Sequence, residues 1–147
     1  EFHMLRPASA VRTGEVVYEA LGSVDIRITP SIKDEGRTLR VVKAGYLVSC
    51  RVACDSYDND GNGPFVQLSD GSGWLFEKKM HQQVLREVPV QVGTWIFEVQ
   101  NSPVGLALCS QPIDDEPFKY DVVCPPTKQI TFDRKVVSSN GVSFYRI

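Results

Sequence analysis

Histidine, the side chain that most often moves protons in enzymes, is nearly absent from this sequence. One of its two histidines, His3, lies in the segment Glu1–Met4, which resembles a cloning scar ahead of a start methionine. The other, His81, lies in a polar stretch, where we expect it to be exposed. A Ser-His-Asp or Cys-His site needs a histidine beside its nucleophile. We therefore expect no catalytic residue and a protein that is not an enzyme.

Long apolar runs and charge of one sign are missing too. No run approaches the ~20 residues of a transmembrane helix, and no apolar segment precedes Ala8–Ala10, which mimics a signal-peptidase site. The 16 basic and 18 acidic residues give a net charge of −2 without a basic patch. We expect no nucleic-acid or membrane partner and an intracellular protein that is not secreted, with a plastid location left open.

Motifs for phosphate and metal ligands are scarce. Gly71-Ser72-Gly73 leads into a strand rather than a helix, so we expect no phosphate loop and no cofactor. Asp58-Asn59-Asp60-Gly61-Asn62-Gly63 has the oxygen spacing and the glycine that open a calcium loop. The twelfth position would be Ser69, which has no carboxylate, and a strand follows instead of a helix. We expect a solvated loop and no metal site, with calcium binding as the alternative.

The four cysteines do not form an obvious disulfide or zinc framework. Cys50 and Cys54 would lie ~13 Å apart on a strand, beyond the reach of a disulfide. The close Cys-x-x-Cys pairs of zinc sites are absent. We expect buried free thiols in a reducing compartment, with a bridge between Cys109 and Cys124 left open.

Strand signals dominate what is present. Val24–Ile28 alternates strictly between apolar and polar residues, which is typical of a half-buried strand and would turn Arg27 outward, towards Asp25 or the nearby acidic loop. Similar short runs occupy residues 15–21, 39–42, 46–52, 65–68 and 74–76, and the Asp-Gly segment 69–73 predicts a hairpin turn. Only residues 77–87 have a helix-like composition, which favours a short helix or turn. The sequence thus predicts an all-β protein.

The order of strands and turns recurs along the chain. Gly14–Glu19 corresponds to Gly93–Glu98, and Phe65–Leu68 corresponds to Phe144–Ile147, with an offset of 79 residues at both ends. We therefore expect two tandem copies of one small unit. The expected divisions are an N-terminal tail with the scar at 1–13, a first repeat at 14–79, a linker at 80–92 and a diverged second repeat at 93–147.

The second copy stops before its last hairpin is complete. It has no counterpart of residues 69–79, which hold the Asp-Gly turn and the strand around Trp74. Either a closing strand follows Ile147, or that position of the sheet is open. An open edge presents unpaired N–H and C=O groups and invites another strand.

The first copy resembles the bacterial-type SH3 repeat. The matching residues are Val24-Asp25-Ile26-Arg27-Ile28-Thr29-Pro30-Ser31, the turn Lys43–Gly45 and the hairpin Phe65–Phe76. The resemblance covers about residues 14–79 and implies a small SH3-like barrel that is mostly non-catalytic, binding cell-wall peptides or other proteins. Its Asp-Gly-x-Gly-Trp form is similar to repeats of algal and protist proteins. The paired arrangement is similar to the pyrenoid shell proteins of diatoms, which tile into protein sheets.

Two functions fit these features. The first is a non-enzymatic structural protein that assembles with itself through exposed strand edges, into an oligomer or a sheet-like lattice. The alternative is a peptide- or glycan-binding interaction module of a larger protein, with an aromatic groove. The interaction residues that we expect are Tyr57, Phe65, Trp74, Phe144, Tyr145 and Ile147. A core position is the alternative for Tyr18, Phe65 and Trp74, because a small barrel has few other large side chains.

Overall fold

The computed structural model describes residues 11–33, 36–55, 62–100, 106–109, 111–112, 119–126 and 128–146. The secondary-structure elements of this part of the chain are β-strands, and all the strand pairings are antiparallel. The predicted all-β fold is therefore confirmed. Among the described residues, none forms a helix with the length and apolarity needed to cross a membrane.

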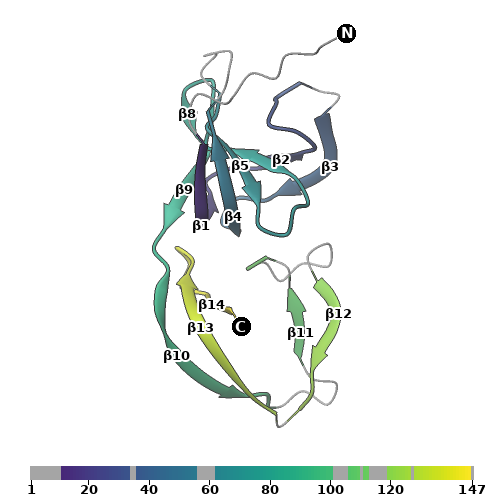
Figure 1. The fold of residues 1–147 in the computed structure, drawn as a ribbon, viewed down its shortest axis with the longest axis vertical. Coiled ribbons are helices and arrows are strands. Elements are labelled where there is room, and N and C mark those ends of the chain that lie inside the picture. Colours follow the sequence, from purple (N-terminus) through teal and green to yellow (C-terminus); the bar gives the residue numbers. More distant parts are fainter. Residues whose placement is uncertain are drawn as a thin grey trace.

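A seven-stranded sheet forms the upper part of the molecule in Figure 1. Its spatial order is β3-β2-β6-β5-β4-β1-β9. The strands are β1 (Val11–Ala20), β2 (Val24–Arg27), β3 (Arg37–Val42), β4 (Leu47–Cys54), β5 (Phe65–Leu68), β6 (Trp74–Phe76) and β9 (Leu85–Val88). β5 and β6 have the bounds that the sequence predicts, because a strong Asp-Gly turn separates two short apolar runs.

The main core lies within this sheet. Its strands are rich in valine, leucine and phenylalanine, which suit a pleated and buried surface. Phe65 and Phe76 face each other across β5 and β6, with ring centroids 6.4 Å apart in an edge-to-face arrangement. Each fully buried apolar side chain contributes about 1.5–3 kcal/mol of burial free energy. The core residues with no exposed surface are Ile26, Val42, Val48, Leu68, Leu75 and Leu85.

The residue that precedes β6, Gly73, lies close to β2. A Cβ atom on Gly73 would meet the Cγ2 of Ile26 at 2.4 Å and the carbonyl oxygen of Arg27 at 2.6 Å. Gly73 also has a φ of +157°, in a region that other residues rarely adopt. Only glycine therefore fits between the predicted hairpin turn and the strand that follows it.

Arg27 points inward, so the prediction that it faces solvent is wrong. It is 1% exposed, and its Nη1 donates hydrogen bonds to the carbonyl oxygens of Ile32 and Lys33, both at 3.0 Å. Its Nη2 lies 3.7 Å from the Asp25 carboxylate, and its guanidinium lies 5.8 Å from the ring centre of Phe76. The alternation pattern misleads here because the following loop folds back and supplies carbonyl acceptors to an inward-facing cation.

The helix-like segment 77–87 forms strands instead, so the prediction of a short helix is wrong and that of a turn is right. β7 (Lys78–Lys79) and β8 (Gln82–Gln83) make a hairpin whose two turn residues, Met80 and His81, have φ values of 49° and 66°. β9 then pairs with β1 and completes the first sheet. Residues 80–92, expected as a linker, thus belong largely to sheets, and β1 begins at Val11 within the expected tail.

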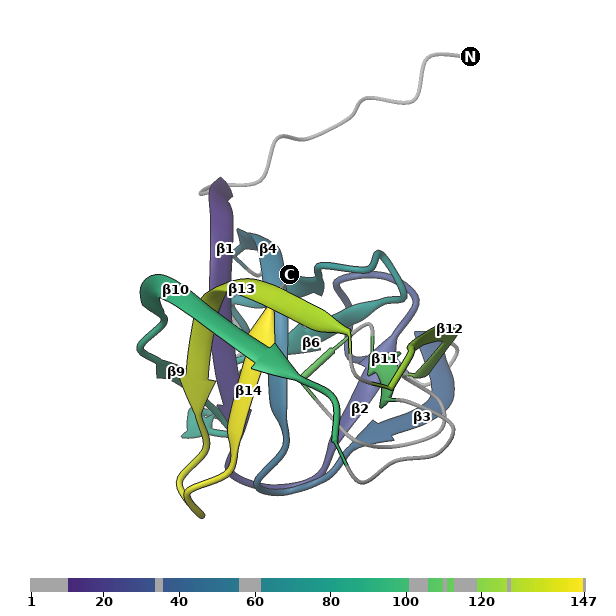
Figure 2. The same cartoon turned by 90° about the horizontal axis from the view of Figure 1, so that it is seen from below.

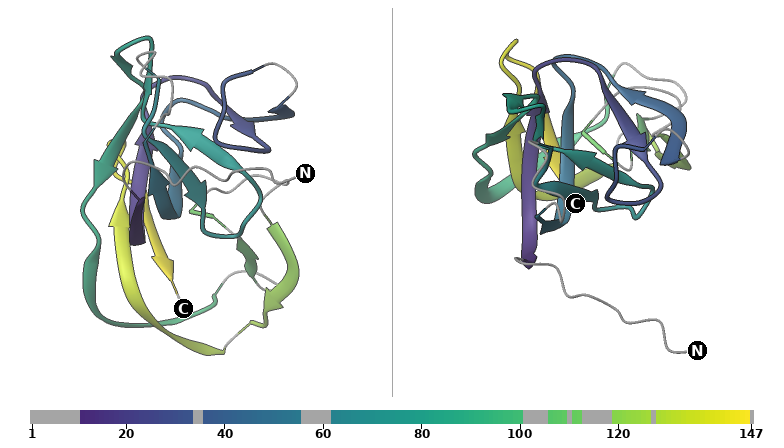
Figure 3. Two further views of the ribbon diagram at one scale, coloured as in Figure 1. Left: turned by 45° about the horizontal axis from the view of Figure 1, so that its top comes forward. Right: turned by 90° about the horizontal axis from the view of Figure 1, so that it is seen from above.

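The lower part of the molecule holds two smaller sheets. β10 (Gln91–Glu98), β13 (Gln129–Val137) and β14 (Ser143–Arg146) form one sheet in the order β10-β13-β14, and β11 (Leu106–Cys109) pairs with β12 (Lys119–Cys124) in the other. In Figures 1 and 3 the β11–β12 hairpin lies across from the curved β10 and β13, and β9 leads directly into β10 along one side.

The strand pairings of the upper part recur in the lower part. The ladder β10–β13 matches β1–β4, β11–β12 matches β2–β3, and β13–β14 matches β4–β5. Equivalent pairs are Val16↔Cys50 and Trp95↔Phe132, Arg27↔Arg37 and Cys109↔Lys119, and Cys54↔Phe65 and Val136↔Phe144.

Even the irregularities of these ladders recur. The register shifts between Thr13 and Val16 on β1 and between Val92 and Trp95 on β10, which lie 79 residues apart. These repeated registers agree with the repeat found in the sequence, whose origin in a duplication stays a prediction.

A small apolar cluster joins the two parts. Val17, Leu47, Val88 and Val136 are buried together, and Phe144 packs against them. Figure 2 shows the same junction from below, with β10, β13 and β14 lying across β1 and β4. Because β1, β4 and β9 supply the upper side and β13 the lower side, the two parts share a hydrophobic contact and not merely a chain segment.

Candidate interaction surface

In the upper part, β6 is the strand that closes the sheet. It pairs with β5 through Phe65↔Phe76, Val66↔Leu75 and Gln67↔Trp74. On its other side it pairs with β2 through Arg27↔Trp74. β6 therefore bridges two strands that would otherwise both be edges.

In the lower part, the described residues supply β14 with a partner on one side only. It pairs with β13, and no strand among the described residues pairs with its other edge. The matched registers show which backbone groups face that edge. On β5, the Leu68 N–H donates to Gly73 and the Pro64 carbonyl accepts from Glu77, both bonds being 2.9 Å.

The backbone groups of alternate residues point to the same side of an antiparallel strand. The residues of β14 equivalent to Pro64 and Val66 are Ser143 and Tyr145. The N–H and C=O groups of Ser143 and Tyr145 therefore point to the open edge.

Four aromatic rings, contributed by all three strands of the β10-β13-β14 sheet, contact one another, and one of them is on β14. Tyr145 of β14 contacts Trp95, Phe97 and Phe132, with ring centroids 6.0, 4.8 and 5.7 Å away. Phe97 and Phe132 lie 5.9 Å apart. These distances are typical of tilted and edge-to-face ring pairs, each contributing about 0.5–1.5 kcal/mol beyond burial. We call Trp95, Phe97, Phe132 and Tyr145 the aromatic cluster.

The aromatic cluster occupies the positions of a core cluster in the upper part. By the shared registers, its members correspond to Val16, Tyr18, Cys50 and Val66. The last three of these are at most 5% exposed, and Val16 packs against the same core. In contrast, Phe97 is 43% exposed, and its three neighbours are only half-buried. The aromatic cluster is thus a core that remains partly uncovered.

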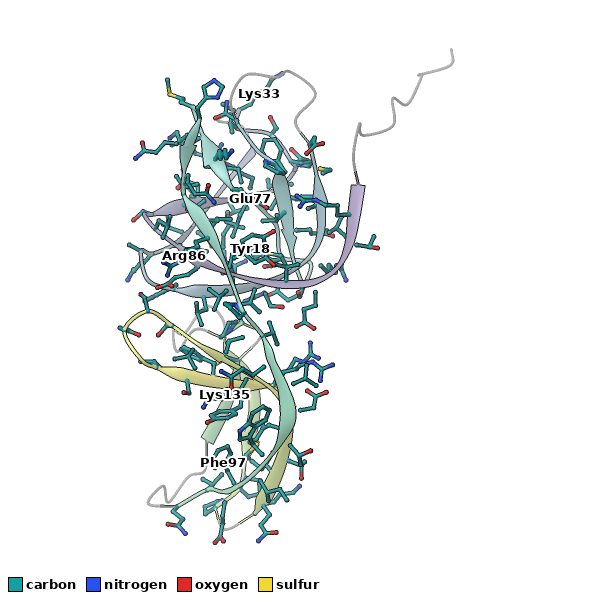
Figure 4. The ribbon with its side chains drawn as sticks, turned by 90° about the vertical axis from the view of Figure 1, so that its left-hand side faces the viewer. Tyr18, Lys33, Glu77, Arg86, Phe97 and Lys135 are labelled. Carbon is teal, nitrogen blue, oxygen red and sulfur yellow. The ribbon has the colours of Figure 1, made fainter. Side chains whose placement is uncertain are left out.

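Positive charges flank the aromatic cluster. The ammonium of Lys135 lies 5.7 Å from the ring centre of Tyr145, a cation–π distance, and Figure 4 shows Lys135 and Phe97 together in the lower part. Arg146, at the end of β14, forms ion pairs with Glu15 of β1 and with Asp133, the latter at 3.7 Å. The open edge therefore carries one direct electrostatic link to the upper part.

A second polar contact, at Glu19, links the two parts. Glu19 of β1 is 3% exposed, and Arg86 donates a hydrogen bond of 2.6 Å to its carboxylate. The backbone N–H of Ser139 donates to the same carboxylate at 3.3 Å, and the Ser139 hydroxyl donates as well. Burial raises the pKa of Glu19, but the bonds from Ser139 and Arg86 outweigh it, so the pKa lies below its ordinary value of 4.5.

The predicted interaction residues fall into different environments. Phe65 is 4% exposed and belongs to the core, the position that was its alternative. Trp74 is half-buried against that core, and Phe144 packs at the junction, beside a cavity of about 230 Å³. Tyr145 lies at the open edge. Tyr57 and Ile147 lie outside the described residues, and an interaction role for all of these residues stays a prediction.

Trp95, Phe97 and Phe132 are surface residues that the sequence pattern did not lead us to expect. A usable signal was present, because Trp95 and Phe97 alternate on a predicted strand and match Val16 and Tyr18 in the repeat. Larger side chains in a unit with no counterpart of β6 among its described residues are consistent with an incompletely covered core. The pairing of β10 with β13, which brings Phe132 beside Trp95, could not be derived from the pattern alone.

Two buried groups of the upper part, Cys50 and Tyr18, have raised pKa values. Burial, followed by the charges of Asp70 and Glu77, raises the pKa of the Cys50 thiol, which keeps it protonated and weakly nucleophilic. Burial also raises the pKa of Tyr18, whose hydroxyl donates a 2.8 Å hydrogen bond to Glu77. Figure 4 shows Tyr18 and Glu77 in the upper part of the molecule, away from the open edge.

Of the two alternatives left open by the sequence, the structure describes the cysteines but not most of the calcium-like loop. No disulfide joins Cys109 to Cys124, since Cys109 pairs with Lys119 and Cys124 with Leu106 at the other end of that hairpin. Within the described residues, no three His, Cys, Asp or Glu side chains gather as a metal site requires. Most of the calcium-like loop, residues 58–61, lies outside the described residues.

Comparisons with known proteins assign this chain to no family. No family description matches it, and no curated protein is significantly similar to it. The crystal structure of a putative autolysin from Listeria monocytogenes is similar over 95% of this chain, with 11% identity and a TM-score of 0.31. The chain spans 58% of the length of that protein. A likeness at this level carries no conclusion about function, and the resemblance to SH3 repeats stays a prediction.

Proposed function

We propose that this protein is a non-catalytic interaction protein that associates with other protein chains through the open edge of β14. The observation that supports this most directly is a difference in exposure between two equivalent residues. Tyr18 of the upper part is 5% exposed, whereas Phe97, at the same register position of the lower part, is 43% exposed. An edge strand beside exposed aromatic rings combines unpaired hydrogen-bonding groups with apolar surface, and strand addition satisfies both.

The partner that we propose first is a second copy of this chain. Two β14 strands related by a two-fold axis pair antiparallel when Tyr145 opposes its own copy. In that register Phe144 faces Arg146 of the other copy, so no like charges stand opposite each other. The Tyr145 backbone groups, which point to the open edge, would bond each other across the axis.

Sedimentation velocity over a concentration series tests this assembly. We expect the sedimentation coefficient of the wild-type chain to rise with concentration. Ser143→Pro removes an outward N–H without touching the bonds to β13, so it should weaken association about tenfold. Ser143→Ala, which keeps that N–H, is the matched control and should behave as wild type. A chain that stays monomeric at the highest concentration reached would exclude self-association.

A peptide- or glycan-binding role is the second candidate. The exposed face of Phe97 and its half-buried neighbour Trp95 favour it, because aromatic rings bind extended proline-rich peptides by stacking. Peptide or glycan binding should be lost in Phe97→Ser and unaffected by Ser143→Pro. Strand addition, in contrast, should be weakened by Ser143→Pro. Binding arrays probed with these two variants therefore separate the two functions.

A further inference from the structure

We infer that the open edge of β14 accepts an extended segment with the chemistry of β6, reading aromatic-leucine-aromatic and bound antiparallel in the register of β6. This inference rests on the proposed function, since both require an available edge. It goes further by naming the kind of strand that fills the edge and the residues that it faces. The occupant is a partner segment of this type.

The register of the incoming strand follows from the repeated ladders. In the upper part, Trp74, Leu75 and Phe76 oppose Gln67, Val66 and Phe65. The residues of β14 at the equivalent positions are Arg146, Tyr145 and Phe144. An incoming segment in the same register would place its first aromatic residue at Arg146, its leucine at Tyr145 and its second aromatic residue at Phe144.

The incoming strand would also reach the second sheet of the lower part. β6 contacts β2 where Trp74 pairs with Arg27. By the matched pairings, the residue of β11 at the position of Arg27 is Cys109. One strand would therefore join the β10–β13–β14 sheet to the β11–β12 hairpin, which lies across from it in Figure 1. Self-pairing of β14 is not required to make this second contact.

The side chains at the edge favour an apolar segment. In the upper part, Leu75 and Phe76 are 0% and 3% exposed and belong to the core that holds Tyr18 and Val66. The aromatic cluster presents apolar rings at the matching positions of the lower part. The buried cation of the upper part has no equivalent here, because Cys109 stands where Arg27 stands in the first unit. Burying a charged side chain beside these rings would be unfavourable without a partner.

Peptide binding gives the first test. The probe is a fluorescein-labelled peptide with the sequence of residues 69–77, Ser-Asp-Gly-Ser-Gly-Trp-Leu-Phe-Glu. We expect saturable binding by anisotropy, and slower hydrogen exchange at the Tyr145 amide. The matched control carries N-methyl-leucine, which removes one backbone donor, and should bind about tenfold more weakly. A scrambled peptide should not bind. Equal binding of all three peptides would overturn the inference.

Covalent addition of the same segment gives the second test. Because Ile147 matches Leu68 in the repeat, residues 69–77 can be appended directly after Ile147. The appended strand should raise Tm by about 3–6 °C, because it buries additional apolar surface in a chain of this size. It should also abolish binding of the free peptide. A matched chain with lysine in place of the appended leucine should show neither effect.

The outcomes distinguish this inference from the function on which it rests. If neither the free nor the appended segment has an effect, but Ser143→Pro still weakens self-association, the strand type is wrong and a second copy is the occupant. If Ser143→Pro has no effect and the peptide does not bind, both proposals fail. If the peptide binds and also dissociates the self-associated protein, both stand and share one edge.

Discussion

Tyr18 and Phe97 stand at the same register position of two matching ladders, yet they meet different surroundings. Tyr18 is 5% exposed and donates its hydroxyl to Glu77. Phe97 is 43% exposed, although the rings of Phe132 and Tyr145 lie against it. In the first unit, Leu75 and Phe76 of β6 belong to the same core cluster as Tyr18, and no described strand takes the place of β6 in the second unit. This contrast sets the expectations for the variants below.

Truncation of Tyr145 should cost less than truncation of a residue of the main core. Tyr145→Ala removes contacts with three rings that are themselves half-exposed, so we expect a loss of about 1–2 kcal/mol in unfolding free energy. Phe65→Ala, at a site that is 4% exposed, should cost about 3–5 kcal/mol. Urea denaturation of both variants measures the difference. Equal losses would mean that the aromatic cluster is as well covered as the core.

Replacement of Arg27 should be strongly destabilising although the residue is charged. Arg27→Ala leaves the carbonyl oxygens of Ile32 and Lys33 without their donor and opens a cavity, so we expect a loss of about 2–4 kcal/mol. Arg37 lies near the same carboxylate of Asp25, at 3.6 Å, but its side chain is 48% exposed. Arg37→Ala is therefore the control and should cost below about 1 kcal/mol. Thermal or chemical unfolding measures both losses. Equal losses of stability in the two variants would contradict the structural role given to Arg27.

A methyl group at Gly73 should disturb the closure of the first unit. The Cβ atom of Gly73→Ala would lie 2.4 Å from the Cγ2 of Ile26 and 2.6 Å from the carbonyl oxygen of Arg27, so both groups would have to move. The substitution would also strain the backbone at a positive φ. We expect a loss of about 2–4 kcal/mol. Gly45 also has a positive φ, of 85°, but a Cβ added there would meet nothing within 4 Å, so Gly45→Ala should cost about 1 kcal/mol. Comparison of the two denaturation midpoints separates crowding from backbone strain.

The hydrogen bonds to Glu19 should make the free energy of unfolding fall as the pH becomes acid. The pKa of Glu19 is lower in the folded protein than in the unfolded chain, so the unfolded chain binds the proton more readily. The stabilisation is complete above the ordinary pKa of 4.5 and is lost as pH falls through the lower folded pKa.

Denaturation of wild type and Glu19→Gln at neutral and acid pH measures this dependence. The variant should be less stable at neutral pH, and its unfolding free energy should fall less steeply below pH 4.5. Arg12→Gln, which removes a largely exposed partner of Glu77, is the control and should keep the wild-type slope. An unchanged slope in Glu19→Gln would show that other carboxylates carry the acid sensitivity.

Local patterns predict the strands better than they predict what the strands face. β5 and β6 have their predicted bounds because the Asp-Gly turn and two apolar runs agree with each other. The charged composition of segment 77–87 suits a helix, but Met80 and His81 adopt positive φ values and pairing with β1 holds Leu85–Val88 extended. Tertiary pairing overrides weak local preference there.

The candidate surface was only partly predictable for a related reason. Among the described residues no strand takes the place of β6 in the second repeat, and Tyr145 lies on the strand at that edge. Burial of Arg27 and exposure of Phe97 depend on which loop or strand covers each site, and a single sequence does not contain that information. Phe65, expected as either a contact or a core residue, lies in the core beside Phe76, and its interaction role stays a prediction.

Arg146 serves two neighbours at once. It ends the strand whose edge is open, and it also holds Glu15 of the first sheet. Occupation of the edge that fixes Arg146 more firmly would strengthen its hold on Glu15, and by thermodynamic linkage a firmer hold on Glu15 would raise the affinity for the occupant by the same factor. A measurement on β1, far from the edge in sequence, would then report occupancy. If the edge is occupied, this ion pair would make the first unit a reporter of that occupancy.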